Sequence, residues 1–311
     1  MERMTDNKII LVTQKTRLEQ MVVRYNTIGQ AKFFIEHSGG TFGDYEREHE
    51  TYTAAAAAAE EILARFGRVL RVDRDLVPTM VFGPTDTVVA LGRDGLAANV
   101  LKYIGGLNLI GVNPDPARWD GLLLPFTVND LAKLLPEVIK GTRRTESVTL
   151  AECTLSDGQS ICAVNDLFIG RRTHVSAQYE ISLGGRTERQ SSSGIIVSTG
   201  LGSTGWLRSV IAGAKGISRG CGYGIESELE NGFGRGESYL YYTVREPFPS
   251  KTTGTDIVFG RIDRGEPLTV SSLMPENGVI FSDGVEQDCL MFNSGTTAQI
   301  TVSDRRGMLV V

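Results

Sequence analysis

The stretch Thr87-Val-Val-Ala-Leu-Gly-Arg-Asp-Gly-Leu-Ala-Ala-Asn-Val-Leu-Lys-Tyr-Ile-Gly-Gly106 passes from a strand pattern through a tight turn into a helix. Its short apolar run, Val88–Leu91, is typical of a parallel strand that is covered on both faces. Apolar residues then recur at helical spacing up to the paired glycines, where a helix normally ends. The stretch therefore predicts a strand–turn–helix unit of a parallel α/β sheet.

The turn within this unit is Gly92-Arg93-Asp94-Gly95. A turn between a strand and a helix leaves unpaired backbone N–H groups at the positive end of the helix dipole, which favours a phosphate there. The carboxylate of Asp94 could cap the helix, hold Mg2+, or accept a proton from a hydroxyl that attacks a phosphate. This short pattern alone does not choose among the three.

The composition bounds the class of protein. A length of 311 residues favours two domains, and 32 basic against 37 acidic residues argue against a general nucleic-acid or anionic-membrane binder. Four cysteines without a CxxC pair and only three histidines suggest neither a zinc site nor a disulfide framework. No stretch approaches the roughly 18 apolar residues of a membrane span. We therefore expect a soluble, unexported, cytoplasmic protein.

The first part of the chain alternates strands with helices, which predicts a doubly wound α/β nucleotide-binding domain over residues 1–142. Pro136 is expected to interrupt or kink the last helix. The expected strands are 9–12, 69–72, 88–91 and 109–112, and the expected helices are 16–35, 44–66, 96–104 and 131–139.

The remaining residues, 143–311, predict a β-rich domain whose last strands could pack back on the first domain. Asp157-Gly158 and Gly184-Gly185 predict hairpin turns, and a final hairpin is expected around Arg305–Gly307. The glycine-rich segment Gly213–Gly236 has little apolar periodicity, so we expect a mobile loop there, either a lid or a surface loop without function.

Two further segments could carry chemistry. Ala163–Gly170 places Asn165 and Asp166 inside an apolar run, where burial requires polar partners, supplied either by a ligand or by the turn itself. Ser198–Trp206 follows an apolar strand and combines small residues with hydroxyls, which lets a backbone approach a ligand closely. A plain flexible connection is the alternative for the second segment. Phe281–Gly284 contains an Asp-Gly pair, which by itself is most often a turn.

The order of these segments resembles the NAD kinase family, and within it the mitochondrial type and its bacterial relatives, over nearly the whole chain. The family's Gly-Gly-Asp-Gly-Thr turn is similar to Gly92–Leu96, its Asn-Glu pair falls on Asn165 and Asp166, and its Gly-Ser-containing loop falls on Thr199–Trp206. Further segments that are similar in order are Gly111–Pro116, Tyr179–Ser182, Arg245–Pro247 and Asp283-Gly284.

The resemblance implies a nucleotide-binding α/β domain followed by a β-sandwich-like domain, and transfer of the terminal phosphate of ATP to the adenosine-ribose 2'-hydroxyl of NAD. Asp94 would be the base or the hydroxyl-orienting residue, Mg2+ would accompany ATP, and no protein metal site, nucleic acid or membrane is implied. A homodimer or higher homo-oligomer is expected. The implied nucleotide-binding residues are Gly92, Arg93, Gly95, Asn113, Asn165, Asp166, Thr199, Gly202, Ser203, Thr204 and Asp283.

Three positions depart from the family pattern. Arg93 replaces a glycine, which removes a residue that takes positive φ cheaply and adds a cation that could bind a phosphate or block it. Leu96 replaces a threonine hydroxyl, and Asp166 is one methylene shorter than glutamate. The alternatives are therefore an inactive NAD or nucleotide sensor of the same fold, or a related kinase that acts on another hydroxyl. Arg171, Arg172 and His174 either supply positive charge near the ribose or are simply solvated.

Overall fold

A computed structural model describes residues 4–311, apart from the side chain of Gln287. The chain divides into two compact units. Unit 1 runs to Glu146 and also includes Met308–Val311, whereas unit 2 is Ser147–Gly307.

Unit 1 is built on a parallel sheet with the strand order β2-β1-β3-β4, followed by the end of β16. Buried Val, Ile and Leu residues fill its central strands, as a sheet covered on both faces requires. The predicted parallel α/β sheet is confirmed. The strands are β1 (Lys8–Thr13), β2 (Arg68–Asp73), β3 (Thr87–Leu91) and β4 (Asn108–Val112).

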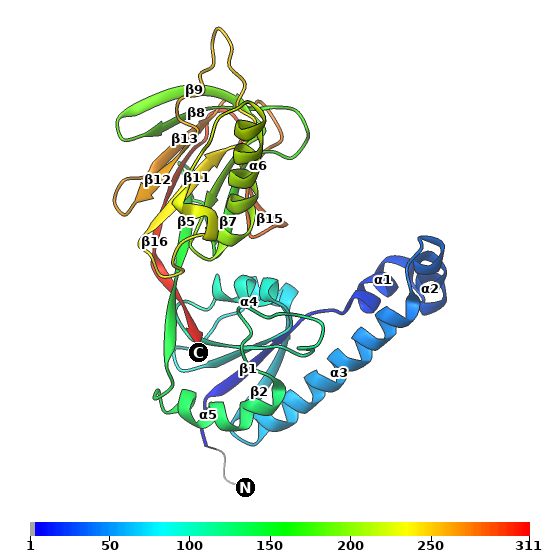
Figure 1. Ribbon diagram of the computed structural model, residues 1–311. Coiled ribbons are helices and arrows are strands. Elements are labelled where there is room, and N and C mark those ends of the chain that lie inside the picture. Colours follow the sequence, from blue (N-terminus) through cyan, green and yellow to red (C-terminus); the bar gives the residue numbers. More distant parts are fainter. Residues whose placement is uncertain (1–3) are drawn as a thin grey trace. The chain divides into compact units, whose positions relative to one another are not determined.

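Helices cover both faces of this sheet. Helices α3 and α5 pack on one face through a shared apolar cluster, and α4 lies on the other face (Figure 1). The helices are α1 (Arg17–Tyr25), α2 (Ile28–His37), α3 (Phe42–Ala64), α4 (Asp94–Leu101) and α5 (Leu131–Ile139), with 3-10 turns at Arg74–Thr79 and Val128–Asp130.

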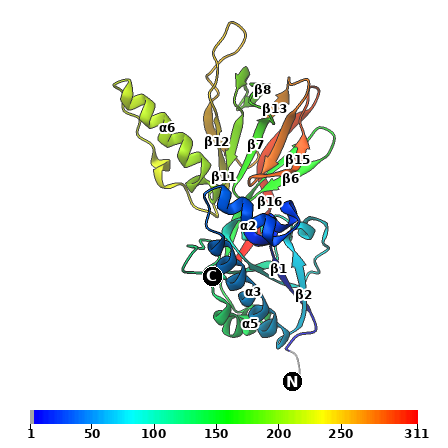
Figure 2. The same ribbon diagram turned by 90° about the vertical axis from the view of Figure 1, so that its right-hand side faces the viewer.

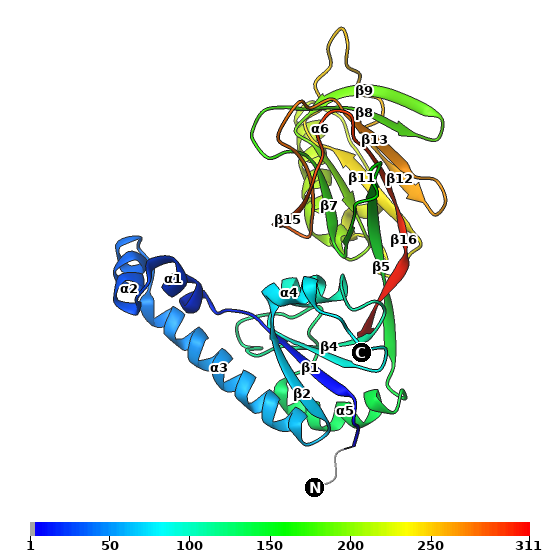
Figure 3. The ribbon, with the colours of Figure 1, turned by 180° about the vertical axis from the view of Figure 1, so that it is seen from behind.

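Two helix predictions in unit 1 are wrong in detail. The single helix expected over residues 16–35 is broken at Asn26, which adopts φ 67°, and Thr27 then caps α2. Of the two effects expected at Pro136, the interruption is wrong, because α5 continues through this residue to Ile139, whereas the kink stays a prediction. Both short helices, α1 and α2, lie at the far end of the long helix α3 from α5 (Figure 3).

Unit 2 contains two sheets of antiparallel pairs around one apolar core, which includes Leu167, Ile169, Tyr179 and Val197. One sheet contains β5 (Thr145–Leu155), β6 (Ser160–Ala163), β8 (Ala177–Leu183), β9 (Arg186–Ser192), β13 (Leu268–Ser272) and β16 (Thr297–Val310). The other has the order β12 (Phe259–Asp263), β11 (Tyr239–Val244), β10 (Ile195–Ser198), β7 (Asp166–Arg171), β14 (Gly278–Ser282) and β15 (Val285–Met291).

Two predictions in unit 2 are also wrong. The hairpin expected around Arg305–Gly307 is absent from the described chain, because β16 runs through these residues as one continuous strand. The segment Gly213–Gly236, expected to be a loop, begins inside helix α6 (Trp206–Gly220) and contains a 3-10 turn at Glu228–Asn231. Helix α6 lies on the outside of unit 2 (Figure 2), and only its residue Leu207 is buried.

Candidate active site

The turn Gly92–Gly95 lies at the carboxyl end of β3. The N–H of Gly92 donates to the carbonyl of Val112 at 3.1 Å, which ties the turn to the neighbouring strand β4. Arg93 is the N-cap residue of α4 and has φ −115° and ψ 168°, an extended conformation that any residue adopts. None of these four residues has a positive φ. The freedom to take a positive φ, which Arg93 lacks, is therefore not needed at this position.

The side chain of Asp94 binds the backbone of the loop that follows β4. Its Oδ1 accepts the N–H of Leu123 at 2.7 Å, and its Oδ2 accepts the N–H of Leu122 at 3.2 Å. Asp94 is the first residue of α4 rather than its N-cap, so the helix-cap interpretation is wrong. The two amides fix the orientation of the carboxylate at the positive end of α4.

Asn113 is buried and organises this same loop, residues 113–124. Its Nδ2 donates to the carbonyl of Trp119 at 2.8 Å, while its Oδ1 accepts the N–H of Asp115 at 3.0 Å. The structure therefore gives Asn113 a loop-stabilising contact, and its predicted part in nucleotide binding stays a prediction.

Arg93 does not point freely into solvent. Its Nη2 donates to Oε1 of Glu48 at 2.8 Å, and its guanidinium carbon lies 3.9 Å from the centroid of the Trp119 ring. The residue that replaces the family's glycine is thus held on α3 and on the loop that also binds Asp94.

In unit 2 the Asn165-Asp166 pair lies where the chain enters β7. The carboxylate of Asp283, in the turn between β14 and β15, accepts the N–H groups of Val164, Asn165 and Asp166 at 2.6 to 3.2 Å. The carbonyl of Asn165 accepts the N–H of Thr199 at 2.9 Å. Three segments that are distant in the sequence, predicted to act together, therefore meet in unit 2.

The carboxylate of Asp166 is buried, which disfavours its charged form. Its Oδ1 is shielded from solvent and has no hydrogen-bond partner among the described residues. Burial raises the pKa of Asp166 to about 7, an interaction with the Ser198 hydroxyl opposes the shift, and the charge of Asp283 adds to it. A side chain on Gly202 would come within 2.8 Å of this oxygen, so a glycine at 202 leaves Asp166 its space.

The hydroxyls of the 199–204 loop mostly hold the loop itself. Thr199 Oγ1 donates to the carbonyl of Val164 at 2.5 Å, and Ser203 Oγ donates to that of Gly200 at 2.7 Å while accepting the N–H of Phe233 at 3.0 Å. Thr204, in contrast, is exposed. Among these hydroxyls, Thr204 is the most accessible to a ligand.

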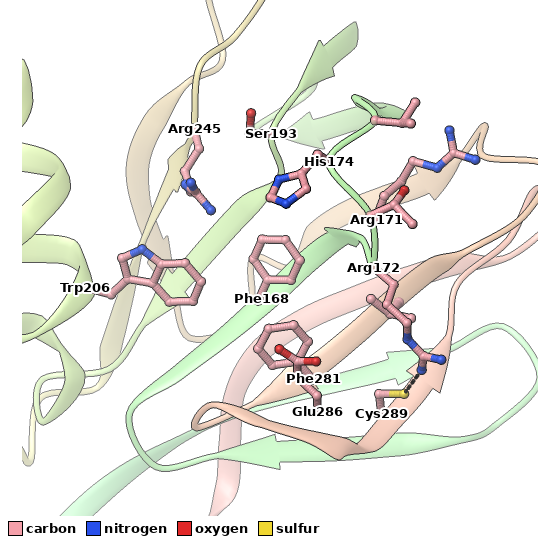
Figure 4. A pocket seen from close by; sticks show the side chains of 13 residues that line it. Phe168, Arg171, Arg172, His174, Ser193, Trp206, Arg245, Phe281, Glu286 and Cys289 are labelled. Carbon is pink, nitrogen blue, oxygen red and sulfur yellow. Dashed lines mark hydrogen bonds between the residues drawn. The ribbon is translucent and has the colours of Figure 1, made fainter. Parts of the chain in front are cut away.

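A cavity of about 300 Å³ opens on the outer face of the six-stranded sheet in unit 2. The ring of Phe168 lies between those of Trp206 and Phe281, with centroids 5.7 and 4.9 Å away (Figure 4). The guanidinium of Arg245 lies 5.5 Å from the Trp206 ring centroid. None of these four residues was among the predicted site residues. Strand alternation was the available signal, because Phe168 faces away from the core that its neighbours Leu167 and Ile169 enter.

Cations outnumber carboxylates among the charged residues that line this cavity. The lining contains Arg171, Arg172 and Arg245 and one carboxylate, that of Glu286, and Arg245 also lies 3.7 Å from Glu246. Arg172 donates to Sγ of Cys289 at 3.0 Å, and the buried Nε of Arg171 has no acceptor within the described chain. His174 also lines the cavity, so the residues considered as a source of positive charge gather here. Aromatic rings beside cations suit a planar ligand that carries negative charge.

Across residues 4–311, no group of three or more His, Cys, Asp or Glu side chains is arranged to hold a metal ion. In the same part of the chain, no helix combines the length and the apolar character that a membrane crossing needs.

Comparison with solved structures relates this architecture to known proteins. Yeast NADH kinase, solved with NADH, matches over 99% of this chain and 84% of its own, with a TM-score of 0.56 and 15% identity. The NAD kinase of Archaeoglobus fulgidus, solved with ATP, matches over 98% of this chain and 93% of its own, with a TM-score of 0.55 and 17% identity. This chain has an NAD kinase-like fold. No protein-family model matches it, and no curated protein matches it in sequence.

Proposed function

We propose that this protein transfers the terminal phosphoryl group of ATP to the adenosine-ribose 2'-hydroxyl of NAD, giving NADP. The observation that carries the proposal is the NAD kinase-like fold, which extends over nearly the whole chain. The similar yeast protein was solved with NADH and the similar archaeal protein with ATP, which are the two classes of ligand that the reaction requires.

Asp94 is the proposed catalytic residue. The ribose hydroxyl gives its proton to the carboxylate as its oxygen forms a bond to the γ-phosphorus of ATP. The bond between that phosphorus and the β–γ bridging oxygen breaks, and ADP leaves. The amides of Leu122 and Leu123 hold the carboxylate in one orientation, so part of the positioning that catalysis needs is already built. Mg2+ enters with ATP as part of the substrate and neutralises phosphate charge.

The proposed nucleotide-binding residues are those that the resemblance implies. In unit 1 they are Gly92, Arg93, Gly95 and Asn113, and in unit 2 they are Asn165, Asp166, Thr199, Gly202, Ser203, Thr204 and Asp283. To these we add the cavity of unit 2, where the Trp206 ring can stack on one of the two bases of NAD and Arg245 offers a cation for its phosphates.

The direct test is incubation of the purified protein with NAD or NADH, ATP and Mg2+, followed by detection of the phosphorylated dinucleotide. We expect product with the wild type and a loss of at least roughly a hundredfold in kcat with Asp94→Asn, the lower end of general-base contributions. An unchanged rate in Asp94→Asn would remove this residue from its role.

A nucleotide sensor is the second candidate, and one observation favours it. Both oxygens of Asp94 already accept backbone N–H groups, which gives this carboxylate a role in holding the loop after β4 that needs no phosphotransfer. Binding of NAD in calorimetry without any product would establish the sensor and overturn the kinase.

A further inference from the structure

Five charged side chains of unit 1 form what we term the arginine–carboxylate cluster: Arg17, Asp44, Glu48, Arg93 and Arg118. Arg17 binds both carboxylates, and Arg118 lies 2.6 Å from Asp44 and 3.6 Å from Glu48. Arg93 reaches Glu48 at 2.8 Å. Three guanidinium groups thus share these two carboxylates, and Arg118 also lies 3.5 Å from a third, that of Asp115.

The two carboxylates have different partners. Glu48, whose side chain is 10% exposed, contacts all three arginines. Asp44 contacts Arg17 and Arg118, and hydrogen bonds first from Arg118 and then from Arg17 lower its pKa to about 2. No ion pair joins Asp44 to Arg93 among the described residues. Glu48 is therefore the carboxylate that acts on Arg93.

Arg93 is held from two directions. Glu48 accepts from its Nη2, and the Trp119 ring lies 3.9 Å from its guanidinium carbon. A guanidinium has five N–H donors in a rigid fork, so one bond to Glu48 leaves others for a second acceptor. The side chain is 37% exposed, which gives an anion access to them. A planar cation stacked on a ring and bonded at one end is pre-organised for two-point binding of a phosphate group.

We propose that Arg93 binds the diphosphate of a nucleotide substrate, and that Glu48 and Trp119 are positioning residues that hold its guanidinium ready. This inference rests on the proposed function, since ATP and NAD both carry a diphosphate. The backbone of Arg93 is extended and unstrained, and its side chain supplies a cation within the turn Gly92–Gly95, directly before Asp94.

The test is a calorimetric titration of ATP and of NAD, separately, into wild type, Glu48→Gln and Trp119→Ala. We expect both variants to bind one nucleotide at least roughly tenfold more weakly, and the nucleotide affected identifies whose diphosphate Arg93 binds. Asp44→Asn is the matched control, because it removes a carboxylate of the same cluster that does not touch Arg93; we expect its affinity within about twofold of wild type. Trp119→Phe, which keeps a ring, should restore much of the affinity.

Thermal unfolding of each variant separates loss of binding from loss of folding. Arg93→Ala removes the guanidinium itself at a part-exposed position, and it should lower the affinity for the same nucleotide. Where turnover is measurable, positioning of a binding group predicts a raised KM with kcat nearly unchanged.

The outcomes separate this inference from the proposed function. Wild-type binding of a nucleotide without NADP formation overturns only the proposed reaction. Unchanged or tighter binding by folded Glu48→Gln, Trp119→Ala and Arg93→Ala overturns the role of Arg93. An equal loss in Asp44→Asn overturns positioning and leaves the cluster as a structural clamp, and no binding of either nucleotide by the wild type overturns both proposals.

Discussion

Oδ1 of Asp283 accepts the backbone N–H of Asn165 at 2.6 Å, so the turn between β14 and β15 is bound to the start of β7. Asp283 itself adopts φ 54° and is followed by Gly284 at φ 71°, which places its carboxylate over the amides of Val164, Asn165 and Asp166. A residue that the sequence suggested for nucleotide binding thus has a direct part in shaping the segment that carries Asn165.

Replacing Asp283 should destabilise unit 2. Asp283→Ala leaves three amides without their acceptor and puts an alanine in the left-handed region, so we expect a loss of about 2–3 kcal/mol in the free energy of unfolding. Asp283→Asn, which tolerates that backbone and keeps one acceptor, should lose less. Urea unfolding measures both. Asp157→Ala is the control, because Asp157 lies in another Asp-Gly hairpin turn where its bonds go to exposed Gln159. A shift as large in the control would mean that the Asp283 contacts add nothing specific.

Asp166 should make the stability of unit 2 depend on pH. Its folded pKa of about 7 lies above the ordinary value of 3.8, so the folded state binds the proton more tightly. The stabilisation is present below about pH 4 and is lost as the pH rises through about 7, with a change on the order of 2 kcal/mol between pH 5 and pH 8. Asp166→Asn should abolish this change.

Tryptophan fluorescence can follow that transition in unit 2 alone. The two tryptophans lie in different units, Trp119 in unit 1 and Trp206 in unit 2. Urea unfolding at pH 5 and pH 8 in a Trp119→Phe background therefore reports unit 2. The same pH dependence with and without the Asp166 carboxylate would show that another group is responsible.

The cavity beside β7 should bind a ring of NAD. Trp206→Ala removes the indole ring from the cavity lining, and we expect NAD to bind at least roughly tenfold more weakly, the lower end of the loss seen when a base-stacking ring is removed. Trp206→Tyr keeps a ring and should lose less. Phe248→Ala, an exposed phenylalanine outside the cavity lining, serves as the control. Equal affinities for Trp206→Ala and wild type, measured by calorimetry, would remove the cavity from the NAD site.

Gly111 should tolerate no side chain. An added methyl group would overlap the carbonyl oxygen of Leu123, whose amide binds Asp94, so we expect Gly111→Ala to cost about 2–3 kcal/mol and to lower any phosphotransfer. Gly95 has open space around it within α4, and Gly95→Ala should leave stability unchanged or raise it by up to about 1 kcal/mol. Thermal unfolding compares the two. A similar loss of stability in both would contradict the packing argument.

Local patterns were sufficient to predict the strand–turn–helix unit at Thr87–Leu101 and the parallel sheet around it. Apolar runs and the glycines that end helices are signals that extend over only a few residues, so they can be recognised in a single sequence. Local patterns also explain why helix α6 was missed. Gly213, Gly216 and Gly220 lower its helix propensity, and most of the helix is exposed, so it has no buried apolar face to predict it.

Contacts between distant segments could not be predicted in this way. The Arg93–Glu48 hydrogen bond joins residues 45 positions apart in the sequence. The loop after β4 has no periodic pattern, and nothing in the sequence indicates that its Leu123 N–H binds Asp94. The row formed by Phe168, Trp206 and Phe281 likewise depends on strand pairing and on where α6 begins. Residue types marked the candidate segments, whereas the partners of each side chain required the fold.

Strand β16 has a consequence for the biosynthesis of the chain. Met308 and Leu309 pair with Asn108 and Leu109 of β4, yet the ribosome makes them only after every residue of unit 2. Until then the outer edge of β4 presents unpaired N–H and C=O groups, which is the kind of edge that invites pairing with another chain. Completion of the unit 1 sheet is thus postponed until unit 2 has been synthesised, and the β4 edge stays open during that time.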